Sequence, residues 1–348
     1  MARMFPVSKT HMTDKPYDVL TYGRSSIDLY SNDIGAPFEE ITGFGSFAGG
    51  SPLNIATGLV RLNMKAALLT GMGDDKVADF LLHFLEKEGV ETKFIPRIHG
   101  TRTSAVVLGI EPPDRFPLVY YRDNCADTAM TIDHVIAANV SQFRCLEISG
   151  TALNKEPSRS AAFFAVEEAV RSEVPVMLDL DFRHDQWHDP RAFGVTTRAL
   201  LPRVNIAIGT EEEVLATMLT DPKQITIKHQ QISAPEIRGD INEAIAGILQ
   251  LGVDALIVKR GSLGASIHLP DGTATDVPGF PVEIVNVLGA GDAFATGFIY
   301  GYLQGWDHYK SCRMGNACGA IVVTRHGCAN FMPYHDELFA FVEEKGGF

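Results

Sequence analysis

The chain has 348 residues, with 30 Lys and Arg against 43 Asp and Glu, so its formal net charge is −13. Hydrophobic residues make up 45% and charged residues 21%, an ordinary globular composition that excludes wholesale disorder. The acidic balance argues against nucleic acid or an anionic membrane surface as the main partner, although a local cluster of Arg and Lys can still bind a small anion. We therefore expect an acidic α/β protein, and most simply an enzyme.

The five cysteines are thinly spread and form no C-x-x-C pair, which argues against a disulfide framework or a structural zinc site and fits a reducing compartment. No run approaches the roughly 18 apolar residues that a membrane span needs. Residues 1–16 lack the apolar core of a secretory signal. We expect them to form a mobile tail and the protein to be cytoplasmic.

Short apolar stretches alternate with amphipathic ones along most of the chain. Strands are expected at residues 19–30 (with a polar break at 23–26), 66–71, 105–110, 118–121, 145–148, 176–180, 206–208, 255–258 and 284–288. Helices are expected at residues 55–62, 77–88 (closed by Gly89), 158–171 and 241–250, and again after Asp292. This order predicts βαβ units and a mostly parallel sheet covered by helices on both faces.

The segment Gly289-Ala290-Gly291-Asp292 is the most informative one, because it stands between an apolar run and a helix. Glycines let successive backbone N–H groups converge on one anion, and the helix N-terminus adds its positive dipole end. An aspartate at that point could accept a proton from a hydroxyl that attacks a phosphoryl group. A Gly-rich turn with Asp292 as a helix cap explains the local pattern equally well.

Other phosphate-binding motifs are absent or weak. The sequence contains no G-x-x-x-x-G-K-[ST], so it is not a P-loop enzyme. The segment GFGSFA (residues 43–48) matches G-x-G-x-x-A but follows no credible strand, which makes a dinucleotide-binding interpretation weak. The segment KRGSLG (residues 259–264) follows a strand and could contact a nucleotide, although a hairpin turn is the simpler interpretation. Gly49-Gly50 could likewise be a plain helix start with Ser51 as the N-cap.

Acidic and histidine pairs follow other strand ends. Asp179 and Asp181 could serve acid/base chemistry or hold a metal, but a solvated loop is at least as common. His184 and His188 lack the accompanying Glu of a zinc helix, so two exposed histidines in a loop are the simpler interpretation. Residues 211–213 are three glutamates, most often a first helical turn, with a role near nucleotide-bound Mg²⁺ left open.

Taken in order, these motifs resemble the ribokinase-like (PfkB) family of carbohydrate kinases over residues 18–334. The resemblance rests on VNVLGAGDAFATGF (residues 285–298) and on GGSPLNIATGLVRL (residues 49–62) with GDD (residues 73–75). Further segments, among them YRDNCAD (residues 121–127) and DLDFRHDQW (residues 179–187), resemble a branch that phosphorylates a keto sugar acid of myo-inositol breakdown. The resemblance implies one doubly wound domain over residues 17–340, with a small β-rich lid near residues 31–48 and 99–122.

The resemblance also implies a set of site residues. The catalytic residues would be Asp292 as the base, with the amides of Gly289, Ala290 and Gly291 as an anion hole. The substrate-binding residues would be Asp28, Gly49, Gly50, Asn54, Arg122 and Arg183, the two arginines facing the substrate carboxylate. The residues near ATP would be Thr210, Glu213, Lys259, Gly261, Gly264 and Asn316, with Glu213 also tied to Mg²⁺.

Two positions depart from the family pattern. Thr210 stands where the family's N-x-x-E motif has asparagine, and Asn286 stands where relatives have an aspartate that helps bind an activating monovalent cation, so K⁺ dependence is in doubt. The alternative functions are a 2-keto-3-deoxygluconate kinase, a fructokinase or a catalytically silent sensor of sugar acids or nucleotides. A nucleotide-binding dehydrogenase is the least favoured. The resemblance also implies a homodimer and no nucleic-acid or membrane partner.

Overall fold

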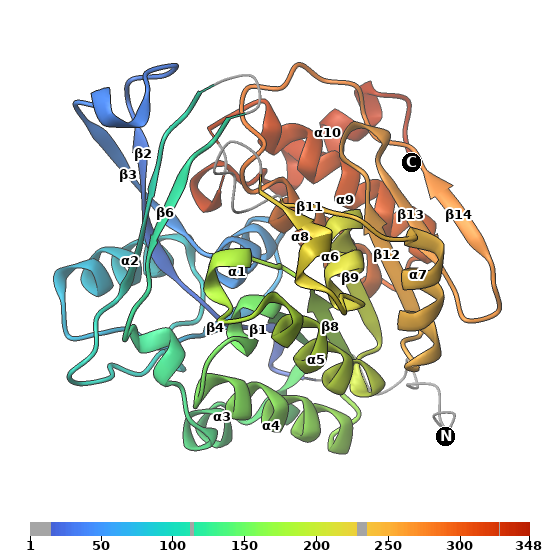
Figure 1. The fold of residues 1–348 in the computed structure, drawn as a ribbon, viewed down its shortest axis with the longest axis horizontal. Helices are drawn as coiled ribbons and strands as arrows, with labels where there is room; N and C mark the ends of the chain where they lie inside the picture. The colour runs from blue at the N-terminus through green and yellow to red at the C-terminus, as the bar shows by residue number, and fades with distance from the viewer. Residues whose placement is uncertain (1–14, 112–114, 228–234, 327) are drawn as a thin grey trace.

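Figure 1 shows the fold of a computed structural model, which describes residues 15–111, 115–227, 235–326 and 328–348. The expected N-terminal tail therefore lies almost wholly outside the described residues. Those residues form a large sheet between two layers of helices, with a smaller sheet beside it. The expected α/β architecture with a mostly parallel sheet is confirmed.

The large sheet has eight strands within the described part of the chain. They are β1 (Tyr17–Tyr22), β4 (Ala66–Leu69), β7 (Phe143–Ser149), β8 (Val176–Asp179), β9 (Ile206–Thr210), β12 (Ala255–Lys259), β13 (Ala265–His268) and β14 (Ala274–Val277). Their spatial order is β14-β13-β12-β9-β8-β7-β1-β4, parallel from β12 to β4 and antiparallel from β12 to β14. The carboxyl ends of the parallel strands thus meet at one edge of the sheet.

Helices cover both faces of this sheet because its central strands are apolar on both sides. One face carries α1 (Ser51–Arg61), α2 (Lys76–Glu88), α8 (Ala290–Leu303), α9 (His308–Val323) and α10 (His335–Glu344). The other carries α3 (Ile132–Ala138), α4 (Ser158–Arg171), α5 (Pro190–Leu200), α6 (Glu211–Thr217) and α7 (Ile241–Gln250). None of the helices in the described ranges is long and apolar enough to cross a membrane.

The smaller sheet contains β2 (Ser26–Ser31), β3 (Phe44–Gly49), β5 (Ser104–Leu108) and β6 (Leu118–Tyr121), in the order β3-β2-β5-β6. It coincides with the segments expected to form a lid, but it begins at Ser26, earlier than residue 31. The polar side chains of Ser26 and Asp28 are buried, so apolar alternation does not mark this start. Residues 112–114, in the expected turn between β5 and β6, lie outside the described residues.

Most expected elements are confirmed, α4 and α7 with the predicted bounds. Gly89 closes α2 with a φ of 87°, a left-handed conformation that glycine adopts without strain. The strand expected at residues 284–288 is wrong. Ile284, Val285 and Val287 remain 44–53% exposed, and the segment is a loop held to the end of α9 through the carbonyl of Val323. The polar stretch 224–240 holds a short hairpin of β10 (Ile225–Thr226) and β11 (Glu236–Ile237).

Candidate active site

Two helix N-termini meet at the centre of the candidate site. Asp292 lies in the first turn of α8, and its Oδ2 accepts a 2.6 Å hydrogen bond from Nδ2 of Asn54, in the first turn of α1. The Oδ1 atom of Asn54 accepts from the backbone N–H of Ala329 at 3.0 Å, which fixes the orientation of the amide. Two residues far apart in sequence, both expected in the site, are therefore in direct contact.

The pKa of Asp292 is raised above its ordinary value, mainly by burial and then by the nearby carboxylate of Asp181. Hydrogen bonding from Asn54 and Ser51 and the charge of Lys259 oppose this rise. An aspartate with a raised pKa is a stronger proton acceptor when ionised than an ordinary aspartate. Asp292 is thus suited to remove a proton from a hydroxyl.

The turn before α8 presents backbone N–H groups at the same place. Gly289 is the N-cap of α8 with a φ of 74°, so Asp292 is not the cap itself. The amide of Ala290 donates to the carbonyl of Val287 at 3.3 Å. No acceptor for the amides of Gly289 and Gly291 is found among the described residues, so these two amides are free to bind an anion, whereas the amide of Ala290, which was also expected to do so, is already engaged.

Lys259, at the end of β12, adds a cation to this turn. A methyl group built on Gly291 would lie 3.1 Å from its Nζ atom, so the ammonium stands directly beside the glycine. The same Nζ is 3.1 Å from Oδ1 of Asp179 and 3.8 Å from Oε2 of Glu213. Burial lowers the pKa of Lys259, but these two acids together raise it above its ordinary value. Lys259 was expected near the nucleotide, and the structure brings it to the helix N-terminus as well.

Acids from neighbouring strand ends complete a buried charge network. Asp179 and Asp181 are 3% and 6% exposed, so the alternative of a solvated loop is wrong for them. Asp181 binds Arg183 at 2.6 Å and also accepts from the hydroxyl of Ser149 at 2.7 Å. Burial raises the pKa of Asp179, and Lys259 opposes that rise. Cations and anions therefore alternate along the carboxyl edge of the sheet.

Glu213 is held from three sides. Its Oε2 accepts from the backbone N–H of Thr210 at 2.8 Å, and the hydroxyl of Thr210 accepts from the N–H of Glu213, forming a capping box at the start of α6. Its Oε1 lies 3.6 Å from Arg183. Thr210 thus replaces the family's asparagine as a helix cap, and the expected first helical turn at residues 211–213 is confirmed.

The small sheet brings Asp28 toward this network. Its Oδ1 accepts from Ser26 at 2.7 Å. Its pKa is raised mainly by burial, and the charge of Asp292 adds to the rise. A methyl group on Gly49 would lie 2.0 Å from the Asp28 carboxylate. Only glycine therefore fits beside this carboxylate in its present position.

The start of α1 needs glycine for a different reason. Gly50 has a φ of 104°, and a methyl group there would lie 2.3 Å from the carbonyl oxygen of Arg24. Gly50 is the N-cap of α1, which makes the expected Ser51 cap wrong, since Ser51 is the first helical residue. The Gly-Gly pair therefore allows the end of β3 to pass closely beside β2 and the segment that follows β1, before α1 begins.

Arg122 is engaged elsewhere. Its guanidinium donates to Oδ2 of Asp127 at 2.5 and 2.8 Å, to the carbonyl of Thr151 at 2.9 Å and to the side chain of Gln186 at 2.5 Å. These bonds tie three loops together and leave little of the guanidinium for a ligand. The structure does not place Arg122 as an open cation.

The remaining residues expected near the nucleotide are Gly261, Gly264 and Asn316, and they lie around β12, β13 and β14. Gly261 and Gly264 flank a short turn between β12 and β13, so the hairpin interpretation of residues 259–264 is confirmed. Gly264 has a φ of 92°, and a methyl group there would lie 2.2 Å from the carbonyl of Val277. Asn316, in α9, donates to the carbonyls of Val277 and Pro278. Asn316 therefore holds the end of β14.

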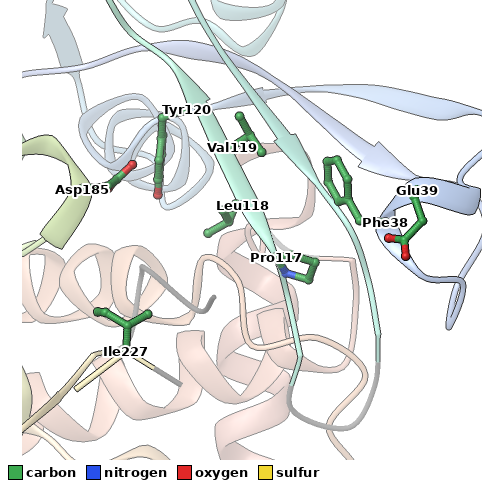
Figure 2. A pocket seen from close by; sticks show the side chains of 8 residues that line it. All are labelled: Phe38, Glu39, Pro117, Leu118, Val119, Tyr120, Asp185 and Ile227. Carbon is green, nitrogen blue, oxygen red and sulfur yellow. The ribbon is translucent and has the colours of Figure 1, made fainter. Parts of the chain in front are cut away.

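A cavity of 570 Å³ opens between the small sheet and the loop after β8 (Figure 2). Its lining residues are Phe38, Glu39, Pro117, Leu118, Val119, Tyr120, Asp185 and Ile227. Figure 2 shows Asp185 and Tyr120 at one end of it. Burial raises the pKa of Tyr120, and the charges of Arg183 and Arg24 oppose this rise. Asp292 does not line this cavity.

Sequence reasoning missed Arg24, Ser26 and Cys328. Arg24 follows β1 and is 8% exposed, and Cys328 contacts both Asp28 and Tyr30. The polar break at residues 23–26 was the available signal for Arg24, because polar residues at the carboxyl end of a central strand lie at the ligand-binding edge. No comparable local pattern marks Cys328.

Comparison with known proteins identifies the family of this chain. The model of the pfkB family of carbohydrate kinases matches residues 17–334. This chain belongs to that family. The kinase is 32% identical over 333 residues to a Clostridium tetani protein named 5-dehydro-2-deoxygluconokinase, covering 95% of this chain and 94% of that relative. A Geobacillus thermodenitrificans relative of the same name is 33% identical over 330 residues, with 94% of each chain covered.

Solved structures share the fold of this kinase. An E. coli protein described as ribokinase II, in complex with ATP and Mg²⁺, aligns with a TM-score of 0.81 at 24% identity, covering 94% of this chain and 99% of that one. A Vibrio cholerae fructokinase with fructose, ADP and a potassium ion aligns with a TM-score of 0.79 at 22% identity, covering the same shares of the two chains. The ribokinase-like fold expected from the motifs is thereby confirmed.

Proposed function

We propose that this kinase transfers the γ-phosphoryl group of ATP to the terminal hydroxyl of 5-dehydro-2-deoxygluconate. The 32–33% identity to relatives of that name supports the substrate. The observation on which the chemistry depends is the pairing of Asp292 with Asn54 at an open helix N-terminus beside Lys259. A base, free backbone donors and a cation converge there, as an in-line phosphoryl transfer requires.

In the proposed reaction Asp292 accepts the proton of the sugar hydroxyl as its oxygen bonds to the γ-phosphorus. The bond from that phosphorus to the bridging oxygen breaks, and ADP leaves with the bonding electrons. The amides of Gly289 and Gly291 and the ammonium of Lys259 stabilise negative charge on the transferred group. Asn54 holds the Asp292 carboxylate in place through its 2.6 Å hydrogen bond.

The residues present fit magnesium bound together with a nucleotide. In the described parts of the chain no cluster of three His, Cys, Asp or Glu side chains could hold a metal alone. Mg²⁺ usually keeps several waters and binds through one or two carboxylates and the phosphates of its nucleotide. Asp179 and Glu213 would hold it in that way at the strand ends. When bound, Mg²⁺ would neutralise phosphate charge.

The residues do not fit a monovalent cation at the loop before α8. Asn286 is 1% exposed, its Nδ2 donates to the carbonyl of His326 at 2.9 Å, and its Oδ1 accepts from the N–H of Leu288 at 3.0 Å. The side chain of Asn286 thus gives the His326 carbonyl a neutral N–H donor, and it gives the loop no carboxylate that would attract a cation. We propose that this kinase works without K⁺.

We also propose a homodimer formed through the outer face of the small sheet. Along β6, Leu118 is buried whereas Val119 and Tyr121 are 40% and 61% exposed. Val119 pairs with Val107 and Tyr121 with Ala105 on β5, so apolar side chains are contiguous on this face. Isologous pairing of this face in two copies would cover it.

The proposed function is tested by a substrate panel and by Asp292→Asn. ADP release should be fastest with 5-dehydro-2-deoxygluconate, ahead of 2-keto-3-deoxygluconate and fructose. The variant should bind the sugar acid but lose activity by about 10²- to 10⁴-fold, because asparagine cannot accept the proton. Faster turnover of fructose would show that the substrate assignment is wrong. Near-normal activity of Asp292→Asn would exclude Asp292 as the base.

A further inference from the structure

Arg24 lies where the two sheets meet, between the main sheet and the substrate side of the small sheet. It follows β1 directly, and only 8% of its surface is exposed. Its Nη1 donates to the hydroxyl of Ser26 at 2.6 Å, and that hydroxyl donates to Asp28 at 2.7 Å. Its Cζ lies 5.3 Å from the centre of the Tyr120 ring, which lines the cavity in Figure 2.

The charge of Arg24 has no direct partner, unlike that of its neighbours. Arg122 contacts Asp127 at 2.5 Å, and Arg183 contacts Asp181 at 2.6 Å. Among the described residues no carboxylate oxygen lies within 4.0 Å of an Arg24 nitrogen, and Asp28 is reached only through Ser26. A buried cation is costly unless an anion is paired with it. Burial lowers the pKa of Arg24, but the charges of Tyr120, Asp28, Asp127 and Asp181 raise it overall, so these groups stabilise the cation from a distance and leave the place of a contacting anion open.

One nitrogen of the guanidinium is left for a ligand. Nη1 is occupied by Ser26, whereas Nε has no hydrogen-bond partner and is covered by protein. No described residue accepts from Nη2. Nη2 is therefore the charged donor that an incoming carboxylate oxygen could meet.

We propose that Nη2 of Arg24 binds the carboxylate of the sugar acid and makes this kinase select acids over neutral sugars. The inference rests on the proposed function and sharpens it by assigning the acid group to Arg24 in place of Arg122 and Arg183, which already contact Asp127 and Asp181. Asp28, held on the other side of Ser26, is then left for sugar hydroxyls. The Tyr120 ring lies beside the guanidinium, with its centre 5.3 Å from Cζ.

The test compares the sugar acid with its neutral amide, which differs only at the carboxylate. Binding of each is measured by calorimetry in the presence of a non-hydrolysable ATP analogue, and turnover is measured separately. Wild-type protein should prefer the acid, and Arg24→Gln should weaken acid binding roughly 10- to 150-fold while removing most of the preference. Arg24→Lys should show an intermediate loss, because lysine keeps the charge but lacks the planar guanidinium that also donates to Ser26.

Arg122→Gln serves as the contrasting variant, and it should retain the preference for the acid. Melting temperature and affinity for the ATP analogue show whether each variant is folded. If Arg24→Gln is folded and still prefers the acid, Arg24 is not the determinant, although the kinase assignment stands. If wild-type protein does not turn over the acid, the proposed substrate fails. In that case the role of Arg24 is still decided by binding, because the ratio of acid affinity to amide affinity can be compared between wild type and Arg24→Gln.

Discussion

Replacing Asn286 by aspartate should make the loop before α8 respond to K⁺. In the wild-type protein the amide of Asn286 donates to the His326 carbonyl at 2.9 Å and accepts from the Leu288 N–H at 3.0 Å. Aspartate keeps the acceptor but loses the donor, so a carboxylate oxygen faces a carbonyl oxygen in a buried position. A cation between the two oxygens would relieve that repulsion.

The size of the effect follows from burial. Losing one hydrogen bond costs about 1 kcal/mol, and leaving a buried charge unpaired raises the cost to about 3–5 kcal/mol. The unfolding entropy expected for a chain of 348 residues converts this into a fall in melting temperature of about 4–7 °C. Protonation restores a donor, so the pKa of the introduced carboxyl group in the folded variant should exceed its unfolded value of about 3.9. The variant should therefore lose stability relative to wild type as pH rises from acid to neutral.

The assay measures melting temperature and ADP release in matched concentrations of KCl, NaCl and choline chloride. Wild-type protein should behave alike in all three salts, whereas Asn286→Asp should be destabilised in choline and recover in K⁺. Asn286→Ala, which removes both hydrogen bonds without adding a charge, is the control and should not respond to the cation. A requirement of the wild-type enzyme for K⁺ would refute the reasoning, as would equal stability of Asn286→Asp and wild type at neutral pH in choline.

Two further outcomes are expected. Asn54→Leu removes the hydrogen-bond donor that stabilises ionised Asp292, so the pKa of Asp292 should rise further. The acid limb of the pH profile of kcat/KM should then move up by about 1–2 pH units. An unmoved limb would contradict the assignment of Asp292 as the base. Tyr121→Lys places a charge on the outer face of the small sheet, so light scattering should report one chain where wild type gives two. A monomeric wild type would exclude this interface.

The architecture could be predicted well because the sequence patterns that mark helices and strands are local. Helices α4 and α7 were placed within their observed bounds by apolar periodicity, and Gly89 marked the end of α2. The same kind of local signal gave a wrong prediction at residues 284–288, because this run is as apolar as a strand. It stays exposed because its backbone follows Val323, and that contact depends on where α9 ends.

The site was predicted less completely because its contacts are distant in sequence. The contact between Asn54 and Asp292 spans 238 residues and was implied only by the family resemblance. Arg122 and Arg24 have the same chemistry in the sequence, and only the fold shows that Asp127 occupies the first. A side chain's role in this site depends on whether a partner from another strand already binds it.

The small sheet has its own apolar cluster, which gives the molecule an uneven resistance to local unfolding. The buried members of this cluster are Tyr30, Val106, Leu108, Ile110, Phe116, Leu118 and Cys328, against far larger clusters on the two faces of the main sheet. Elements with few buried apolar contacts open at lower free energy than the rest of a fold. We therefore expect the small sheet to open locally at a lower free energy than the main sheet. A ligand that bridges Arg24 and Asp28 to the main sheet would slow hydrogen exchange mainly in strands β2, β3, β5 and β6.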